Sequence, residues 1–181
     1  PVVARAARYG QLLAQVQLGD HTTAAANAQE LARDYPDYPP YVIALSQALL
    51  AGGLAEDAVS VFQGLPDHAR TSPVVAYYLA DALMKAGHLA DARGQLRTAL
   101  RGAPEMAELY RLLARVEGES GHLAQSFQAL AEYHYWRDEV DQALLQLQTA
   151  AGHSGASAYL EASIGARIKE IEAQIAQDAA H

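Results

Sequence analysis

The sequence predicts an all-α fold of antiparallel helical hairpins, and three observations support this prediction. The 181 residues are 51% hydrophobic but only 7% aromatic, with much Ala and Leu, a composition that favours helices over sheets. Four glycines, Gly19, Gly53, Gly87 and Gly121, recur at intervals of 34 residues, so the chain repeats a unit of that length. Proline precedes each new apolar period, in DYPDYPP, TSP and GAP.

Each unit is expected to contain two helices that meet at its glycine. A small residue follows each glycine after five positions: Ala24, Ala58, Ala92 and Ser126. The glycine ends the first helix where a positive φ is needed, and the small residue lets the second helix approach the first closely. We therefore expect helices at about 3–18, 21–34, 39–51, 55–66, 73–86, 89–102, 105–120 and 123–136.

The period, the turn glycine, the A-x3-F-like pair and the terminal proline resemble the tetratricopeptide repeat over residues 5 to about 137. The resemblance implies a solenoid with units near 5–38, 39–72, 73–106 and 107–140. One position of the first helix, where that family prefers Gly or Ala, holds Leu12, Ser46, Ala80 and Ala114. The large Leu12 predicts irregular packing in the first unit.

The register changes after the fourth unit. Asp138 lies 17 residues after Gly121 and takes the place of a turn glycine, so residues 123–136 also begin an overlapping half unit that ends near 151. The repeats are thus expected to fill 1–151, followed by a loop at 152–156.

The last segment, 157–181, carries one apolar stripe at helical spacing. Its members are Leu160, Ile164, Ile168, Ile171 and Ile175. We interpret it as a C-terminal capping helix that covers the apolar end of the last hairpin, in preference to a coiled-coil or partner helix.

Charge and composition exclude several classes of function. A formal net charge of -8 without a basic stretch argues against nucleic acid as a partner, and the longest apolar stretch is too short and too polar to span a membrane. Cysteine is absent, which excludes disulfides. The chain begins with Pro1 and no signal peptide, so we expect a fragment of a longer protein.

A search for chemistry predicts no catalytic residue and no metal site in this fragment. The seven histidines form neither an HExxH pair nor a zinc ligand cluster, and phosphate loops and nucleophile elbows are missing. His134, among aromatic residues in EYHYW, is expected to be packed, while His122, Glu117 and Glu119 are expected to be solvated. Catalysis by the fragment itself would have to depend on His134 or Glu132.

Binding of a protein or peptide in the concave groove of the repeats is therefore the expected function. Tyr77, Arg111 and Arg115 form the best candidate hot spot, because aromatic and guanidinium groups dominate contact energies. Alternatively, Arg111 and Arg115 only pair with Glu108 and Glu119 on the same helix, or remain in water. The groove positions of the repeat family fall on Tyr9, Gln47, Tyr77, Asp81, Arg111, Arg115 and Glu119.

The C-terminal third, LAEYHYWRDEVDQALLQLQTA and YLEASIGARIKEIEAQI, resembles the end of the BepA-type zinc metalloproteases. The segment YPPYVIALSQALLAGGLAEDAVSVFQGL is similar to the early repeats of that family. The resemblance implies a periplasmic domain without a cofactor of its own, with zinc and the catalytic Glu of an HExxH helix in a missing N-terminal domain. Its partners would be substrates, its own protease domain and outer-membrane assembly proteins.

A second hypothesis stays open beside this one. A freestanding tetratricopeptide scaffold for a secretion, pilus or other envelope assembly complex would use the same groove without any protease.

Overall fold

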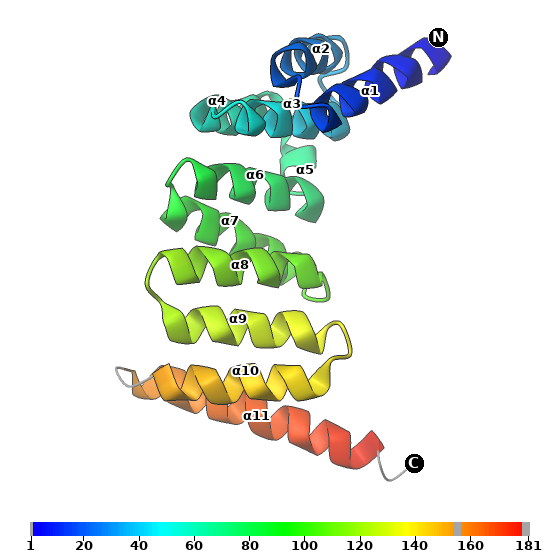
Figure 1. Cartoon of the computed structure of the whole chain (residues 1–181). Helices are drawn as coiled ribbons and strands as arrows, with labels where there is room; N and C mark the ends of the chain where they lie inside the picture. The colour runs from blue at the N-terminus through cyan, green and yellow to red at the C-terminus, as the bar shows by residue number, and fades with distance from the viewer. Residues whose placement is uncertain (1, 154–156, 179–181) are drawn as a thin grey trace. The chain divides into compact units, whose positions relative to one another are not determined.

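The computed structural model describes residues 2–153 and 157–178, and every regular element in these ranges is a helix, as predicted (Figure 1). The chain divides into two compact units, Pro1–Gln95 and Leu96–His181. Each unit has apolar clusters of its own.

The first unit begins with α1 (Val2–Gln17), α2 (His21–Asp34) and α3 (Pro39–Ala51). Their shared core contains Leu12 and Ala24, both fully buried. The large Leu12 is thus accommodated in the core of the first unit.

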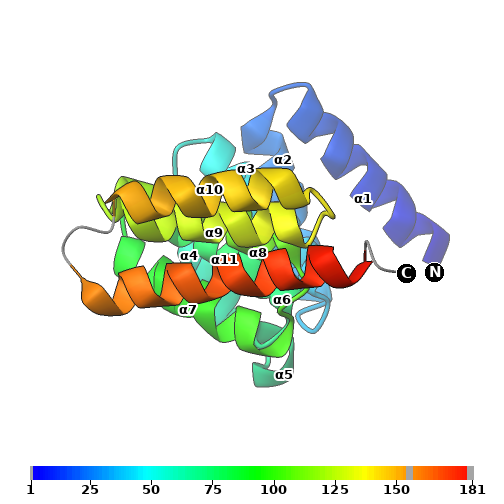
Figure 2. The ribbon, with the colours of Figure 1, turned by 90° about the horizontal axis from the view of Figure 1, so that it is seen from below.

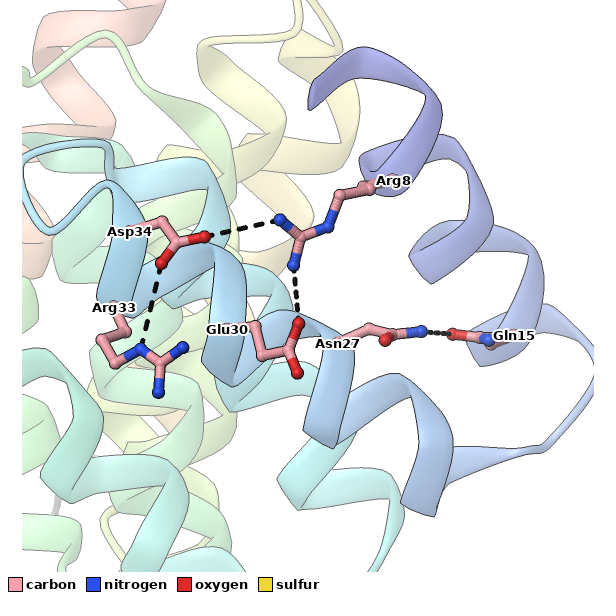
Figure 3. Close-up of polar contacts among 6 residues, drawn as sticks. All are labelled: Arg8, Gln15, Asn27, Glu30, Arg33 and Asp34. Carbon is pink, nitrogen blue, oxygen red and sulfur yellow. Dashed lines mark hydrogen bonds and ion pairs between the residues drawn. The ribbon is translucent and has the colours of Figure 1, made fainter. Parts of the chain in front are cut away.

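Polar contacts hold α1 against α2 along the exposed edge of their contact (Figure 3). The guanidinium of Arg8 donates to Glu30 at 2.8 Å and to Asp34 at 3.4 Å. The amide of Asn27 donates to Gln15 at 2.8 Å. Since exposed ion pairs contribute only about 0–1 kcal/mol each, the apolar core remains the main source of stability for this pair.

The expected helix over 55–66 is wrong in its second half. The structure has a short α4 (Ala55–Ser60), a 3-10 turn η1 (Val61–Gly64) and a separate α5 (Asp67–Arg70). Pro66 explains the break, because proline has no N–H to donate and pushes the preceding residue into the extended conformation.

The first unit closes with α6 (Pro73–Lys85), and α7 (Leu89–Gly102) contains the division between the units. Phe62 from η1 packs with Val75 and Ala82 of α6 in a second apolar cluster, and both Phe62 and Val75 are 1% exposed. The 3-10 turn that replaces the end of the expected helix therefore still places Phe62 in the core.

The second unit contains α8 (Ala107–Glu119), α9 (Leu123–Tyr135), α10 (Val140–His153) and α11 (Ala158–Asp178). Figures 1 and 2 show these helices beside one another, with α11 against the α9–α10 hairpin. In sequence order α9 packs against both α8 and α10.

The apolar stripe of α11 caps that hairpin, as predicted. Ile164 and Ile171 are 1% exposed and join Ala131, Ala143 and Leu147 in one cluster.

α10 is longer than expected and runs two residues into the segment predicted as a loop. The ring of His153 stacks on Phe127 at 5.3 Å, which orders the last turn of α10. The rest of that predicted loop, residues 154–156, lies outside the described residues.

The turns between paired helices have one repeated backbone conformation. All four periodic glycines have positive φ, from 77° to 84°, and Asp138 has φ 62°. At Gly121 the N–H donates to the carbonyl of Gly118 at 3.0 Å, and the next N–H donates to Glu117 at 2.9 Å. Asp138 and the residue after it make the equivalent pair of bonds to Tyr135 and His134. These are helix C-caps in which Asp138 replaces glycine.

Candidate partner-binding surface

Three of the predicted groove residues lie on one exposed face of α8. Arg111, Arg115 and Glu119 are spaced four residues apart, so they project from the same side of the helix. All three are exposed, while Leu112 and Val116, on other sides of the helix, are buried. We call these three residues the α8 face.

The charges of the α8 face are compensated unequally. The Nε of Arg111 donates to Glu108 at 2.7 Å, so the expected alternative pairing of Arg111 within its own helix is present. Among the described residues, Arg115 and Glu119 form no ion pair. Their charges are available to a partner, although the binding role of the α8 face remains a prediction.

Beside these two charges, α8 and α9 form a shallow depression of about 310 Å³. Its lining residues are Ala114, Arg115, Gly118, Glu119, Ser126 and Leu130. The hydroxyl of Ser126 donates to the carbonyl of Ala114 at 2.7 Å, and a Cβ at Gly118 would lie 3.3 Å from that hydroxyl. The depression thus has a fixed floor of small groups beneath a positive and a negative side chain.

The first unit carries three other predicted groove residues, on α3 and α6. Gln47 is exposed on α3. Tyr77 is half-buried on α6, with its ring edge-on to Tyr78 at 5.3 Å. Asp81 accepts a hydrogen bond from Lys85 at 2.8 Å, so its charge is compensated within α6.

Tyr9 has a structural role in addition to its predicted groove position. Its ring lies 5.5 Å from that of Tyr41, which also contacts Tyr38 at 4.7 Å and Tyr35 at 5.8 Å. Burial raises the pKa of the Tyr9 hydroxyl above its usual value, and neighbouring tyrosines raise it further. Tyr9 is half-buried where α1 packs on α3, and its ring contributes to that contact.

The prediction of a solvated Glu117 is wrong. Its side chain is 1% exposed, and its carboxylate lies 2.8 Å from Nδ1 of His122 and 3.0 Å from a guanidinium nitrogen of Arg97. A buried carboxylate needs such partners because burial disfavours its charge. Glu117 follows the buried Leu113 by four residues and so lies on the same side of α8, a spacing that could have indicated its burial.

His134 is packed, as expected. It is half-buried, its ring is edge-on to Tyr133 at 5.2 Å, and its Nδ1 lies 2.6 Å from a carboxylate oxygen of Glu139. Over the part of the chain that the structure describes, no group of three or more His, Cys, Asp or Glu side chains could hold a metal ion.

Within the same described ranges, no helix combines the length and the apolar character that a membrane crossing requires.

Comparisons with known proteins agree with the fold. A family model for the tetratricopeptide repeat matches residues 15–80. MamA from Desulfovibrio magneticus superimposes with a TM-score of 0.62 at 18% identity, covering 94% of this chain and 96% of that one. A thermophilic TPR protein in Thermus thermophilus gives a TM-score of 0.58 at 18% identity, covering 90% of this chain and 97% of that one. The predicted all-α tetratricopeptide-repeat class is confirmed.

The sequence is also similar to the Beta-barrel assembly-enhancing protease of Escherichia coli, with 25% identity over 167 residues. The match covers 92% of this chain, and the chain spans about a third of that relative, 34% of its length. The same protein in Shigella flexneri matches equally well. The resemblance of this chain to the C-terminal region of such proteases is thereby confirmed.

Proposed function

We propose that this chain is a non-catalytic protein-binding domain, the part of a periplasmic zinc metalloprotease that recognises a substrate or partner in outer-membrane protein quality control. The observation that carries the proposal is the similarity to the Beta-barrel assembly-enhancing protease along 92% of the chain. The tetratricopeptide-repeat fold supports the coarser part of the proposal, because arrays of helical hairpins present extended surfaces to proteins and peptides.

The α8 face supplies the contacts in this proposal. Arg115 and Glu119 give a partner one positive and one negative group beside a floor of small side chains. An extended segment with small side chains could approach this floor closely. The charges of that segment would pair with Arg115 and Glu119 and so fix its position along α8. Arg111 would also contribute if its hydrogen bond to Glu108 were replaced by one to an acidic group of the partner.

Zinc belongs to another domain of the parent protein in this proposal. The described residues contain no fitting ligand set, so we assign no step of peptide hydrolysis to them. Their task is to hold the substrate or partner, and to contact the protease domain or outer-membrane assembly proteins.

The test uses the parent protein that contains this domain. Its purified form should hold zinc on an HExxH helix and cleave a misassembled outer-membrane protein. The double variant Arg111→Glu with Arg115→Glu should retain zinc and the melting temperature but lose substrate crosslinking and cleavage. Arg101→Glu, an exposed charge reversal on α7, is the matched control. A parent protein without HExxH and without zinc would refute the protease assignment.

A freestanding scaffold of a secretion, pilus or other envelope assembly complex is the second candidate. The tetratricopeptide-repeat fold supports it as well, because an array of helical hairpins presents the same binding surface with or without a protease domain. A scaffold predicts that crosslinking through the α8 face brings down assembly components and that no cleavage accompanies it.

A further inference from the structure

A second surface feature lies at the turn between α9 and α10, and it shares no residue with the α8 face. A cleft of about 300 Å³ opens there between the turn and the C-terminal half of α11. This volume is at the lower end of the range of about 300–1,000 Å³ found for ligand pockets, which suits one long side chain. The cleft is lined by Tyr135, Trp136, Asp138, Val140, Ile171, Gln174 and Ile175.

The cleft has both polar and apolar walls, and a hydrogen bond holds them in place. The hydroxyl of Tyr135 donates to Gln174 at 2.7 Å, which ties the end of α9 to α11. The ring of Tyr135 lies 5.5 Å from that of Trp136 and nearly perpendicular to it, at 79°. Trp136 is 41% exposed and Ile175 is 40% exposed, so two large apolar side chains remain partly in water at this cleft.

The cleft also carries one uncompensated charge. Asp138 is exposed at the turn, and within the described ranges its carboxylate forms no ion pair. The neighbouring cation, Arg137, donates to Glu139 at 3.0 Å and lies over the ring of Tyr133 at 5.2 Å. Arg137 is thus held by other groups, and the cleft combines aromatic and aliphatic walls with a negative rim.

We propose that this cleft binds a lysine or arginine side chain of a partner protein. The aliphatic stem of such a side chain would cover Ile175 and the ring of Trp136, and its cationic end would pair with Asp138. A purely aliphatic side chain would bring an apolar group beside the carboxylate without compensating it. An acidic side chain would be repelled by Asp138 and by the net charge of -8.

The site gives its own optical signal, because Trp136 is the single tryptophan of the chain. The probes are acetylated and amidated tripeptides Ala-Xaa-Ala with lysine, arginine, norleucine or glutamate in the middle. Lysine and arginine peptides should change the emission of Trp136 in a saturable way, with an affinity at least about fivefold above that of the norleucine peptide. The glutamate peptide should give no saturable change.

Two variants with matched controls complete the test. Asp138→Asn should weaken binding of the lysine peptide about fivefold and leave the fold intact, because Asn tolerates positive φ as well as Asp does. Asp141→Asn, which changes the same charge on exposed α10 surface outside the cleft, should leave binding unchanged. Ile175→Ala should also weaken binding, whereas Leu145→Ala, at an exposed position outside the cleft, should not.

Three results would overturn the proposal. The first is equal binding of the lysine and norleucine peptides, which would indicate a purely apolar site. The second is unchanged binding in Asp138→Asn or in Ile175→Ala. The third is an emission of Trp136 that depends on protein concentration without peptide, which would show that a second copy of the chain occupies the cleft.

Discussion

Arg167 on α11 donates two parallel hydrogen bonds to Glu132 on α9, from Nε to Oε1 at 2.7 Å and from a terminal nitrogen to Oε2 at 2.8 Å. Both side chains are largely shielded, at 19% and 20% exposure. The guanidinium also lies 4.4 Å from the ring centre of Tyr135 and pairs with Glu170. Despite partial burial, its carboxylate neighbours raise the pKa of Arg167, so its charge is permanent. This pair, together with the apolar stripe, fixes α11 on the α9–α10 hairpin.

Removal of this guanidinium should loosen the capping helix. We expect Arg167→Ala to lower the free energy of unfolding by about 2–4 kcal/mol, because it leaves the shielded carboxylate of Glu132 without a partner. Arg167→Lys should recover only part of the loss, since an ammonium cannot form the paired bonds. Urea denaturation followed by circular dichroism measures both. The control is Lys169→Ala on exposed α11 surface, expected within about 0.5 kcal/mol of wild type; an equally small effect at Arg167 would contradict the assigned role.

Substitutions at the glycine turns and at the Asp138 turn should change stability in opposite directions. Gly121 has φ 79°, and a Cβ added there would meet no atom within 4 Å, so Gly121→Ala tests backbone conformation without a steric clash. We expect it to cost about 1–2 kcal/mol. Asp138 has φ 62°, a conformation that glycine adopts at lower cost, so Asp138→Gly should stabilise the protein by less than about 1 kcal/mol. Thermal melts of the two variants decide this, and a stabilising Gly121→Ala would be incompatible with a left-handed turn there.

The turns were predictable from the sequence because their cause is local. Gly53, Gly87 and Asp138 each occupy a position where the helix must end with positive φ, and the spacing alone identified all of them. The break before Pro66 also had a local signal, but the apolar periodicity up to Phe62 concealed it. Local patterns therefore predicted most helix boundaries correctly.

Features that depend on contacts between distant segments were not predictable in this way. The burial of Glu117 requires Arg97 from another helix, and the cleft at Trp136 exists only because Ile175 of α11 lies beside the α9–α10 turn. The repeat register was enough to assign the predicted groove positions to helices. It did not show that Tyr9 also packs against Tyr41, because that contact joins two different helices. Whether the predicted residues bind a partner stays a prediction.

Close packing at the helix crossing gives a test of the repeat register. Ala92 on α7 is fully buried, five residues after Gly87. We expect Ala92→Leu to lower the free energy of unfolding by about 1–3 kcal/mol, because the larger side chain has no space there. Ala90→Leu, exposed on the same helix, should stay within about 0.5 kcal/mol of wild type. If both variants melted at the wild-type temperature, position 92 would not be at the crossing.

The turn after α9 should make stability depend on pH through Glu139. The hydrogen bond with His134 lowers the pKa of Glu139 below its usual value, and Arg137 lowers it further. Because the folded state has the lower pKa, this stabilisation is complete above the unfolded value of about 4.3 and is lost as the pH falls through the folded value. Glu139→Gln should therefore melt below wild type at about pH 6, with a gap that closes towards about pH 3. Melting curves across this range, with the exposed Glu172→Gln as control, measure the gap, and a gap independent of pH would exclude ionisation of Glu139 as its cause.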